Sequence, residues 1–175
     1  MAEDKKEPWL NYLALTTVVF AVCATLSTLK GGGYGSKAVL SQAQASDQWS
    51  YYQAKSIKGY LYELQRDKLA LELKAGILGA AGEYRNKIEF YGSEIDRYKG
   101  DKEEIKKKAE DLEKQRNDAQ KHSGAFGLAA MFLQIAILLS SIAALMKQKY
   151  FWFLGLAAGS LGLVYFFNGF FLFMP

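Results

Sequence analysis

Few residues in the sequence are of types that carry out chemistry, and their spacing does not assemble a catalytic group. His122 is the only histidine, and a Ser-His-Asp relay would have to be built around it and the adjacent Ser123. We interpret His122 instead as a cap or a solvated group at a helix end. Cys23 is the single cysteine, so it has no second thiol to bond and no histidine cluster with which to share a metal. The sequence therefore predicts no enzyme, no metal and no cofactor.

The adjacent carboxylates of the charged region resemble acid-base pairs only superficially. Glu103 with Glu104, and Glu110 with Asp111, avoid the apolar positions of the helix that carries them. We interpret both pairs as a solvated helix face.

Residues 31–35, Gly-Gly-Gly-Tyr-Gly, contain the Gly-Tyr-Gly of a potassium selectivity filter. A filter needs a pore helix before it and a span after it, whereas here a span precedes and a charged helix follows. No Gly-Lys-Ser/Thr follows either, so a phosphate-binding loop is not favoured. We expect these glycines to form a flexible exit from the membrane.

Residues 49–62 interleave aromatic side chains with Lys55 and Lys58. Such a mixture stacks on bases or lies among lipid headgroups. Because the segment follows the first apolar stretch closely, we expect it to pack on the membrane surface or on a neighbouring helix, with no nucleic-acid partner.

The residues discussed so far lie in or between three long apolar stretches. They comprise residues 9–29, 125–146 and 151–174, and none contains Asp, Glu, Lys, Arg or His. Each stretch is 21 to 24 residues long, and about 20 helical residues cross the hydrocarbon layer of a bilayer. We predict three transmembrane helices, of which the first is an uncleaved anchor because its apolar run is long for a signal peptide.

The polar residues inside the predicted spans are not ionisable, so the chain lacks a proton carrier for a pump. Gln134 and Asn168 are expected to hydrogen-bond helices together, although they are also candidate ligands along a transport path. Gly155, Gly159 and Gly162 allow another helix to approach the third span closely. We predict that these five residues make membrane helix contacts.

The charged region between the first two spans is predicted to be helical. Apolar residues recur at alternating steps of four and three, interrupted by Lys102 and Arg116, as in a coiled-coil strand. They are Tyr84, Ile88, Tyr91, Ile95, Tyr98, Ile105, Ala109, Leu112 and Ala119.

Two arms of similar length, residues 36–78 and 83–122, flank a cluster of glycines that is typical of a turn. At about 1.5 Å per residue, an antiparallel hairpin of these arms returns the chain to the same membrane face. A tip near residue 81 would pair three residues of each arm in a seam, namely Ile57 with Ile105, Leu64 with Tyr98 and Leu71 with Tyr91. Continuous helices that pair between subunits are the main alternative.

A second apolar stripe on the first arm comprises Leu61, Leu69, Leu73 and Ile77. One partner helix cannot cover both this stripe and the seam. We therefore expect a homo-oligomer, with an unidentified protein partner as the competing explanation.

The lysines predict the orientation. Lys5 and Lys6 lie in the tail of residues 1–8, and Lys147 and Lys149 lie in the turn of residues 147–150. By the positive-inside rule both segments are cytosolic, which places residues 30–124 outside the cytosol.

Residues 9–63, WLNYLALTTVVFAVCATLSTLKGGGYGSKAVLSQAQASDQWSYYQAKSIKGYLYE, resemble the bacterial membrane proteins grouped as domain of unknown function 4337. The charged middle and the two closing spans fit the same plan. The resemblance implies a bacterial inner-membrane location and brings no activity, ligand or catalytic residue.

Together these features predict an all-α protein with three transmembrane helices and a long extramembrane helical hairpin. The function expected is that of a non-enzymatic, membrane-anchored coiled-coil scaffold that assembles with itself or docks a partner. The alternative is a small channel or transporter subunit whose path is lined by polar residues of the first two spans.

Overall fold

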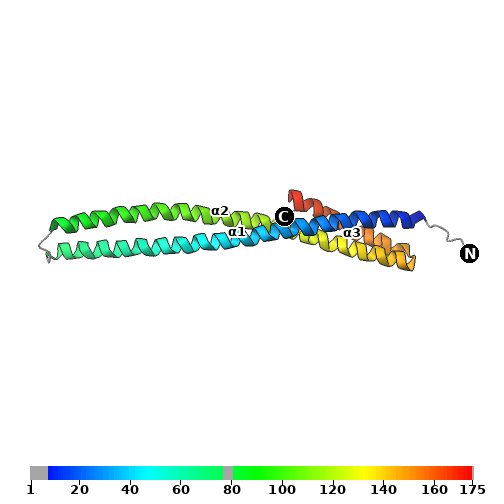
Figure 1. Cartoon of the computed structure of the whole chain (residues 1–175), viewed down its shortest axis with the longest axis horizontal. Coiled ribbons are helices and arrows are strands. Elements are labelled where there is room, and N and C mark those ends of the chain that lie inside the picture. The colour runs from blue at the N-terminus through cyan, green and yellow to red at the C-terminus, as the bar shows by residue number, and fades with distance from the viewer. Residues whose placement is uncertain (1–7, 77–80, 175) are drawn as a thin grey trace, which may run out of the picture. The chain divides into compact units, whose positions relative to one another are not determined.

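The chain is all-helical over the residues that the computed structural model describes, which are 8–76 and 81–174. Helix α1 spans Pro8–Lys74, α2 spans Ala81–Met146 and α3 spans Lys149–Phe171, and these residues contain no strand (Figure 1). The predicted basic tail with Lys5 and Lys6, and Ile77 of the second stripe, lie outside the described residues. All three helices contain a stretch long and apolar enough to cross a membrane.

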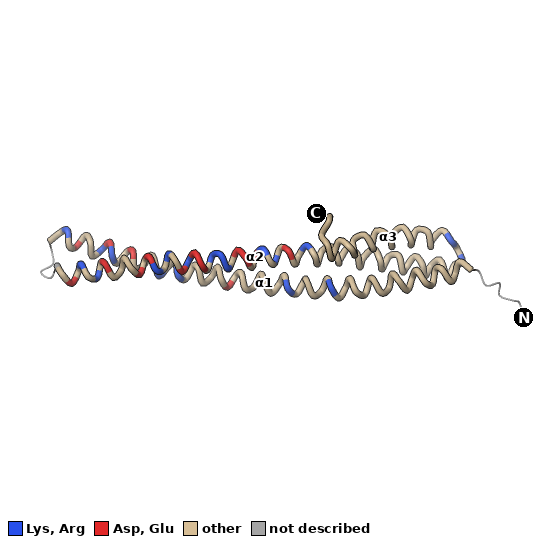
Figure 2. The backbone as a smooth tube through the Cα atoms, turned by 90° about the horizontal axis from the view of Figure 1, so that it is seen from above, with Lys and Arg blue, Asp and Glu red and all other residues tan. Residues whose placement is uncertain are grey.

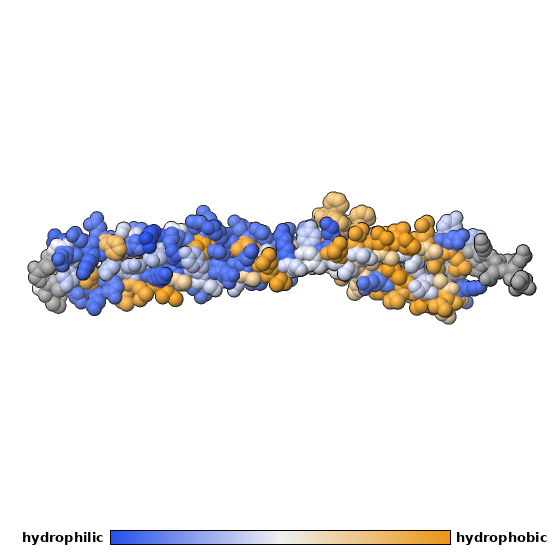
Figure 3. Space-filling model, in the orientation of Figure 1, coloured by the Kyte–Doolittle hydropathy of each residue, from blue (hydrophilic) through white to orange (hydrophobic). Residues whose placement is uncertain are grey.

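The chain divides into two compact units. The terminal unit comprises Met1–Val39 and Arg116–Pro175, and the middle unit comprises Leu40–Gln115. Charged residues are concentrated in the middle unit, whereas the helices of the terminal unit carry few of them (Figure 2). Hydrophobic residues accordingly cover much of the face of the terminal unit that Figure 3 shows.

The prediction that residues 31–35 form a flexible exit is wrong, because α1 continues through all five of them as helix. Two of these glycines serve close packing against α2. A Cβ added to Gly31 would lie 3.1 Å from Cβ of Phe126, and one added to Gly35 would lie 3.3 Å from Oγ of Ser123. A side chain at either position would crowd α2, so glycine here allows helices to approach.

Small residues bring the helices of the terminal unit together around two apolar clusters. In one cluster, Phe20 and Ala24 of α1 pack with Leu133 and Ala136 of α2. In the other, Trp9 and Leu13 of α1 pack with Ala143 of α2. The alanines let the large side chains of the other helix fill the space between backbones.

Helix α3 begins and ends earlier than the predicted range of residues 151–174. The turn before it consists of Lys147 and Gln148, so the predicted four-residue turn is too long by two. At its other end Leu172 adopts a left-handed conformation, with φ of 48°, and its N–H donates to the carbonyl of Asn168. This reversal of the backbone stops the helix at Phe171.

In the middle unit, segments of α1 and α2 contact each other in opposite order along the chain. Trp49 Nε1 donates to Glu113, Lys55 pairs with Asp101, and the Tyr62 ring lies against that of Tyr91. Residues later in α1 therefore contact residues earlier in α2, as in an antiparallel pair of helices.

The stripe predicted on α2 faces inward. Ile95, Tyr98, Ile105, Ala109 and Ala119 are buried, and Tyr84, Ile88, Tyr91 and Leu112 are half-buried. The spacing of four and three therefore identified the covered face of α2 correctly.

The α1 half of the predicted seam is wrong, because Ile57, Leu64 and Leu71 are 61–67 % exposed. The covered face of α1 instead carries residues seven apart, among them Ala45, Tyr52, Gly59, Arg66 and Leu73. Ala45 and Gly59 are small and leave room for the bulky residues of the α2 stripe. A Cβ added to Gly59 would lie 3.7 Å from Cβ of Tyr98, so a tyrosine of α2 lies over a glycine of α1 rather than over Leu64.

Candidate binding surfaces

A partly covered ion pair joins the two helix segments of the middle unit. Nζ of Lys55 lies 2.7 Å from Oδ2 of Asp101, with side-chain exposures of 18 % and 37 %. The ammonium also lies 5.5 Å from the ring centroid of Tyr51 and 5.0 Å from that of Tyr98. An aromatic face attracts a cation, so both rings favour the charged lysine.

These contacts move both pKa values away from neutrality. The hydrogen bond from Lys55 lowers the pKa of Asp101, and the hydrogen bond to Asp101 raises the pKa of Lys55. A lysine nucleophile needs the opposite shift, because only the neutral amine attacks. The pair is therefore suited to holding helices together and unsuited to covalent catalysis.

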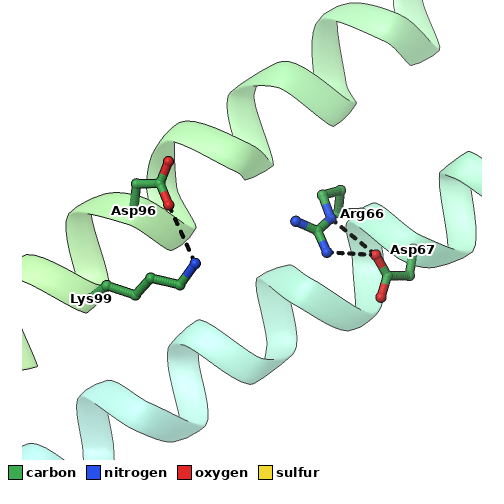
Figure 4. A network of polar contacts seen from close by, with 4 residues as sticks. All are labelled: Arg66, Asp67, Asp96 and Lys99. Carbon is green, nitrogen blue, oxygen red and sulfur yellow. Dashed lines mark hydrogen bonds and ion pairs between the residues drawn. The ribbon is translucent and has the colours of Figure 1, made fainter.

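The other ion pairs between described residues of the middle unit lie within one helix, as Figure 4 shows for two of them. Arg66 pairs with the adjacent Asp67 of α1 at 2.8 Å, and Lys99 pairs with Asp96 of α2 at 3.4 Å. Exposed pairs of this kind contribute about 0–1 kcal/mol of stability. Of the two predicted carboxylate pairs, Glu103, Glu104 and Asp111 are exposed and Glu110 is half-buried, so both pairs lie on a largely solvated helix face.

The aromatic and basic segment of residues 49–62 packs against α2. Trp49 Nε1 lies 2.9 Å from Oε1 of Glu113, and the Tyr62 ring lies 5.6 Å from that of Tyr98. A groove of about 380 Å³ follows this contact and is lined by Lys58, Leu61, Tyr62, Gln65, Tyr91 and Tyr98. Of the interpretations considered for the segment, contact with a neighbouring helix is the one that these distances support.

The outward face of α1 in the middle unit carries an apolar stripe. We call Ile57, Leu61, Leu64 and Leu71 the α1 stripe; each is 55–67 % exposed, and Tyr60 beside them is 62 % exposed. Of the predicted oligomer stripe only Leu61 belongs to it, because Leu69 and Leu73 are half-buried. The inward and outward faces of α1 were therefore exchanged in the prediction, apart from Leu61.

The three glycines predicted on α3 are buried within the terminal unit. A Cβ on Gly155 would lie 3.2 Å from the carbonyl oxygen of Ala136, and one on Gly162 would lie 2.7 Å from Cγ of Leu133. A Cβ on Gly159 would overlap the ring of Phe20. These glycines let α3 pack on α1 and α2 of the same chain.

The two predicted amides have different surroundings. Asn168 is buried, and its Oδ1 accepts a hydrogen bond from the backbone N–H of Met174 at 2.7 Å, so it closes the end of α3 rather than joining two helices. Gln134 is exposed, and its side chain forms no hydrogen bond with the residues described. Gln134 therefore makes no polar helix contact with the described residues of this chain, and its predicted membrane helix contact stays a prediction.

His122 is held by contacts that the sequence did not predict. Its Nδ1 lies 2.8 Å from the carbonyl oxygen of Gly169, and its ring stacks on Tyr34 with centroids 4.5 Å apart. The hydroxyl of Ser123 donates to the carbonyl of Gly31 at 3.0 Å. The serine is thus engaged with backbone, and His122 is neither the cap nor the solvated group that we expected.

A polar pocket of about 600 Å³ lies at another part of the terminal unit. It is lined by Pro8, Trp9, Lys147, Gln148, Lys149, Tyr150 and Phe153. The pocket lies between the start of α1 and the turn that joins α2 to α3. From the sequence, the lysines of this turn were used only to predict the orientation of the chain in the membrane.

Across the described ranges, no cluster of three or more His, Cys, Asp or Glu side chains is arranged to hold a metal ion. Cys23 is half-buried beside the cluster that contains Phe20.

No curated protein and no solved structure matches the chain. One family model does match, over residues 9–172, which is nearly the whole length. The residues that carried the resemblance, 9–63, lie within this match. The chain therefore belongs to the family described as domain of unknown function 4337.

Proposed function

We propose that the protein is a non-enzymatic scaffold, anchored by the terminal unit in a bacterial inner membrane and assembling with copies of itself through the middle unit. The terminal unit would cross the bilayer three times. The middle unit would form an extramembrane antiparallel hairpin that behaves as a coiled coil. The contacts that support the hairpin are those of Trp49, Lys55 and Tyr62 of α1 with α2.

The observation that carries this proposal is the exposure of the α1 stripe. Its four large side chains lie on the part of α1 that belongs to the middle unit, where the other exposed positions are mostly polar, and each is more than half exposed. Fully burying a side chain of this size contributes about 1.5–3 kcal/mol, so covering the stripe by a second copy provides a substantial driving force. Heptad-like spacing from Ile57 to Leu71 suits a helix as the covering element.

Native mass spectrometry from a mild detergent tests self-assembly. We expect an oligomer that dissociates when Leu64→Lys and Leu71→Lys are combined, because charges replace the apolar contact. The matched control combines Asn86→Lys with Gln115→Lys, which adds the same charge at exposed positions of α2. A monomer at every protein concentration, or equal dissociation of both variants, would contradict assembly through the α1 stripe.

Lys147 and Lys149 support a proposed orientation in which the turn between α2 and α3 is cytosolic, because positively charged residues favour the cytosolic side of membrane helices. Single cysteines at Gln148 and Glu103, in a Cys23→Ser background, report the two sides of the membrane. On intact cells an impermeant thiol reagent is expected to label the Glu103 position and spare the Gln148 position. The reverse labelling pattern would overturn the orientation.

A further inference from the structure

The polar pocket of the terminal unit has the composition of an anion site. Two lysines and Gln148 line it together with the aromatic side chains of Trp9, Tyr150 and Phe153. Nζ of Lys149 lies 5.9 Å from the ring centroid of Trp9, so this ammonium lies over an aromatic face. The volume of about 600 Å³ is within the range of small-molecule sites, roughly 300–1,000 Å³.

The positive charge of this pocket is not balanced by the described residues that line it, since none of those residues is Asp or Glu. Over the described part of the terminal unit, Asp118 is the single acidic residue, and it lines a different pocket with Lys121 and Asn168. Lys147 and Lys149 take part in no ion pair with the residues described. An external anion is the counter-charge that fits such a pocket.

The backbone at Lys147 supports a role for this side chain beyond closing the turn. Lys147 has φ of 53°, and Gln148 N–H donates to the carbonyl of Ala143 at 3.2 Å, which is the arrangement that usually places glycine at this position. A non-glycine residue in this conformation is strained. Here the strained residue is a lysine at the pocket.

We propose that this pocket binds the phosphate-bearing headgroup of an anionic phospholipid, with Lys147 and Lys149 as its cationic ligands. The inference rests on the proposed membrane location. Trp9 and Tyr150 fit the same assignment, since indole and phenol rings favour the headgroup level of a bilayer. Basic pockets between membrane helices recognise anionic headgroups, and each lysine near the surface contributes about fivefold to the partition.

Quenching by brominated lipids measures this preference directly, because Trp9 lines the pocket and Trp152 packs against it with ring centroids 6.1 Å apart. The Trp49→Phe background removes the tryptophan of the middle unit. The protein is reconstituted in phosphatidylcholine vesicles that contain a minority of brominated phosphatidylglycerol or, separately, brominated phosphatidylcholine. We expect stronger quenching by the anionic lipid, and loss of this preference in Lys147→Gln combined with Lys149→Gln.

Two further variants separate lipid binding from folding and from general electrostatic attraction. Lys147→Gly relieves the strained backbone, so it is expected to raise or preserve thermal stability while reducing the lipid preference by about fivefold. Lys30→Gln combined with Lys37→Gln removes the same number of charges from exposed positions of α1 away from the pocket. An equal loss of preference in this control pair would show that net charge alone attracts the lipid and would overturn the site.

Flotation with neutral phosphatidylcholine vesicles distinguishes failure of this inference from failure of the proposed function. A protein that does not float with neutral vesicles would contradict the membrane anchor itself. A protein that floats but shows no preference for phosphatidylglycerol would overturn only the lipid site. Inorganic phosphate, added to neutral vesicles, is expected to leave the fluorescence unchanged, and an equivalent response to it would assign the pocket to a soluble phosphate instead.

Discussion

The ring of Phe20 in α1 lies directly over Gly159 in α3, so closely that a methyl group on the glycine would overlap it. Phe20 is 5 % exposed and packs with Ala24 and Leu133, and its ring therefore has little room to turn aside. We predict that Gly159→Ala destabilises the terminal unit by about 1–3 kcal/mol through overpacking.

The matched control is Gly127→Ala in α2, where an added Cβ meets no atom within 4 Å. Replacement of an unhindered helical glycine by alanine stabilises by up to about 1 kcal/mol. Thermal unfolding in detergent, followed by circular dichroism, compares the two variants. Equal stability of Gly159→Ala and the unmodified protein would contradict the close packing of α3 on α1.

The pair Lys55–Asp101 predicts a defined dependence of stability on pH. The pKa of Asp101 is lowered from its ordinary value of 3.8, so its contribution is present above pH 3.8 and is lost as pH falls through the lower, folded pKa. The pKa of Lys55 is raised from 10.5, so its contribution is present below pH 10.5 and is lost as pH rises through the higher, folded pKa. The pair thus stabilises the fold throughout the neutral range.

Asp101→Asn is expected to unfold at a lower denaturant concentration than the unmodified protein at neutral pH. In strong acid the midpoints of the two proteins are expected to move closer together. Asp96→Asn is the control, because Asp96 pairs with Lys99 on its own helix rather than across helices. A pH profile of Asp101→Asn that parallels the unmodified protein down to strong acid would show that the ion pair makes no contribution.

The antiparallel arrangement of the middle unit predicts a short distance within one chain. Spin labels at the exposed positions Gln53 and Glu103 flank the pair Lys55–Asp101. In protein diluted with an unlabelled excess, we expect them within about 20 Å, since packed helices lie about 8–10 Å apart. Short distances that vanish on dilution would indicate helices paired between subunits.

If the terminal unit crosses the membrane as proposed, the exposure of Gln134 predicts a contact between copies at this residue. An exposed amide in hydrocarbon lacks hydrogen-bond partners, and pairing with the same residue of a second copy would supply them. Such bonds contribute about 0.6–2 kcal/mol, so Gln134→Leu is expected to weaken self-association by roughly 3- to 30-fold. Ser141→Ala is the control, because that hydroxyl already donates to the carbonyl of Ile137. Dissociation constants from dilution in detergent compare the two, and unchanged association in Gln134→Leu would exclude this contact.

The covered face of α2 was predictable from sequence, whereas that of α1 was not. On α2, residues such as Ile95 and Ile105 are both the most apolar and the best spaced, so periodicity and burial agree. On α1 they disagree, because the position under Tyr98 requires the smallest residue, Gly59, while Leu64 remains outside. Periodicity ranks residues by apolarity and carries no information about the shape of the opposing side chain. The isolated Gly59 within a long helix was the one available signal.

For the terminal unit, the sequence predicted that helices approach closely but not which helices or residues meet. Gly155, Gly159 and Gly162 indicated close helix approach, which the structure places within one chain. The surroundings of Gln134 and His122 depend on the rotation of α2 against α1 and α3. The apolar stretches of the sequence do not specify this rotation. The pocket at Lys147 joins residues nearly the whole chain apart, so no local pattern could reveal it.

The hydroxyl side chains of the first apolar stretch have a consequence for biosynthesis. Each donates to a carbonyl of its own helix three or four residues earlier; they are Thr16, Thr17, Thr25, Ser27 and Thr28. Because these bonds need no second helix, we expect that a segment inserted as proposed would leave the translocation channel and enter lipid while the rest of the chain is still on the ribosome. Gln134 emerges later and its side chain has no such partner within its own helix, so release of its stretch into lipid is expected to await another helix.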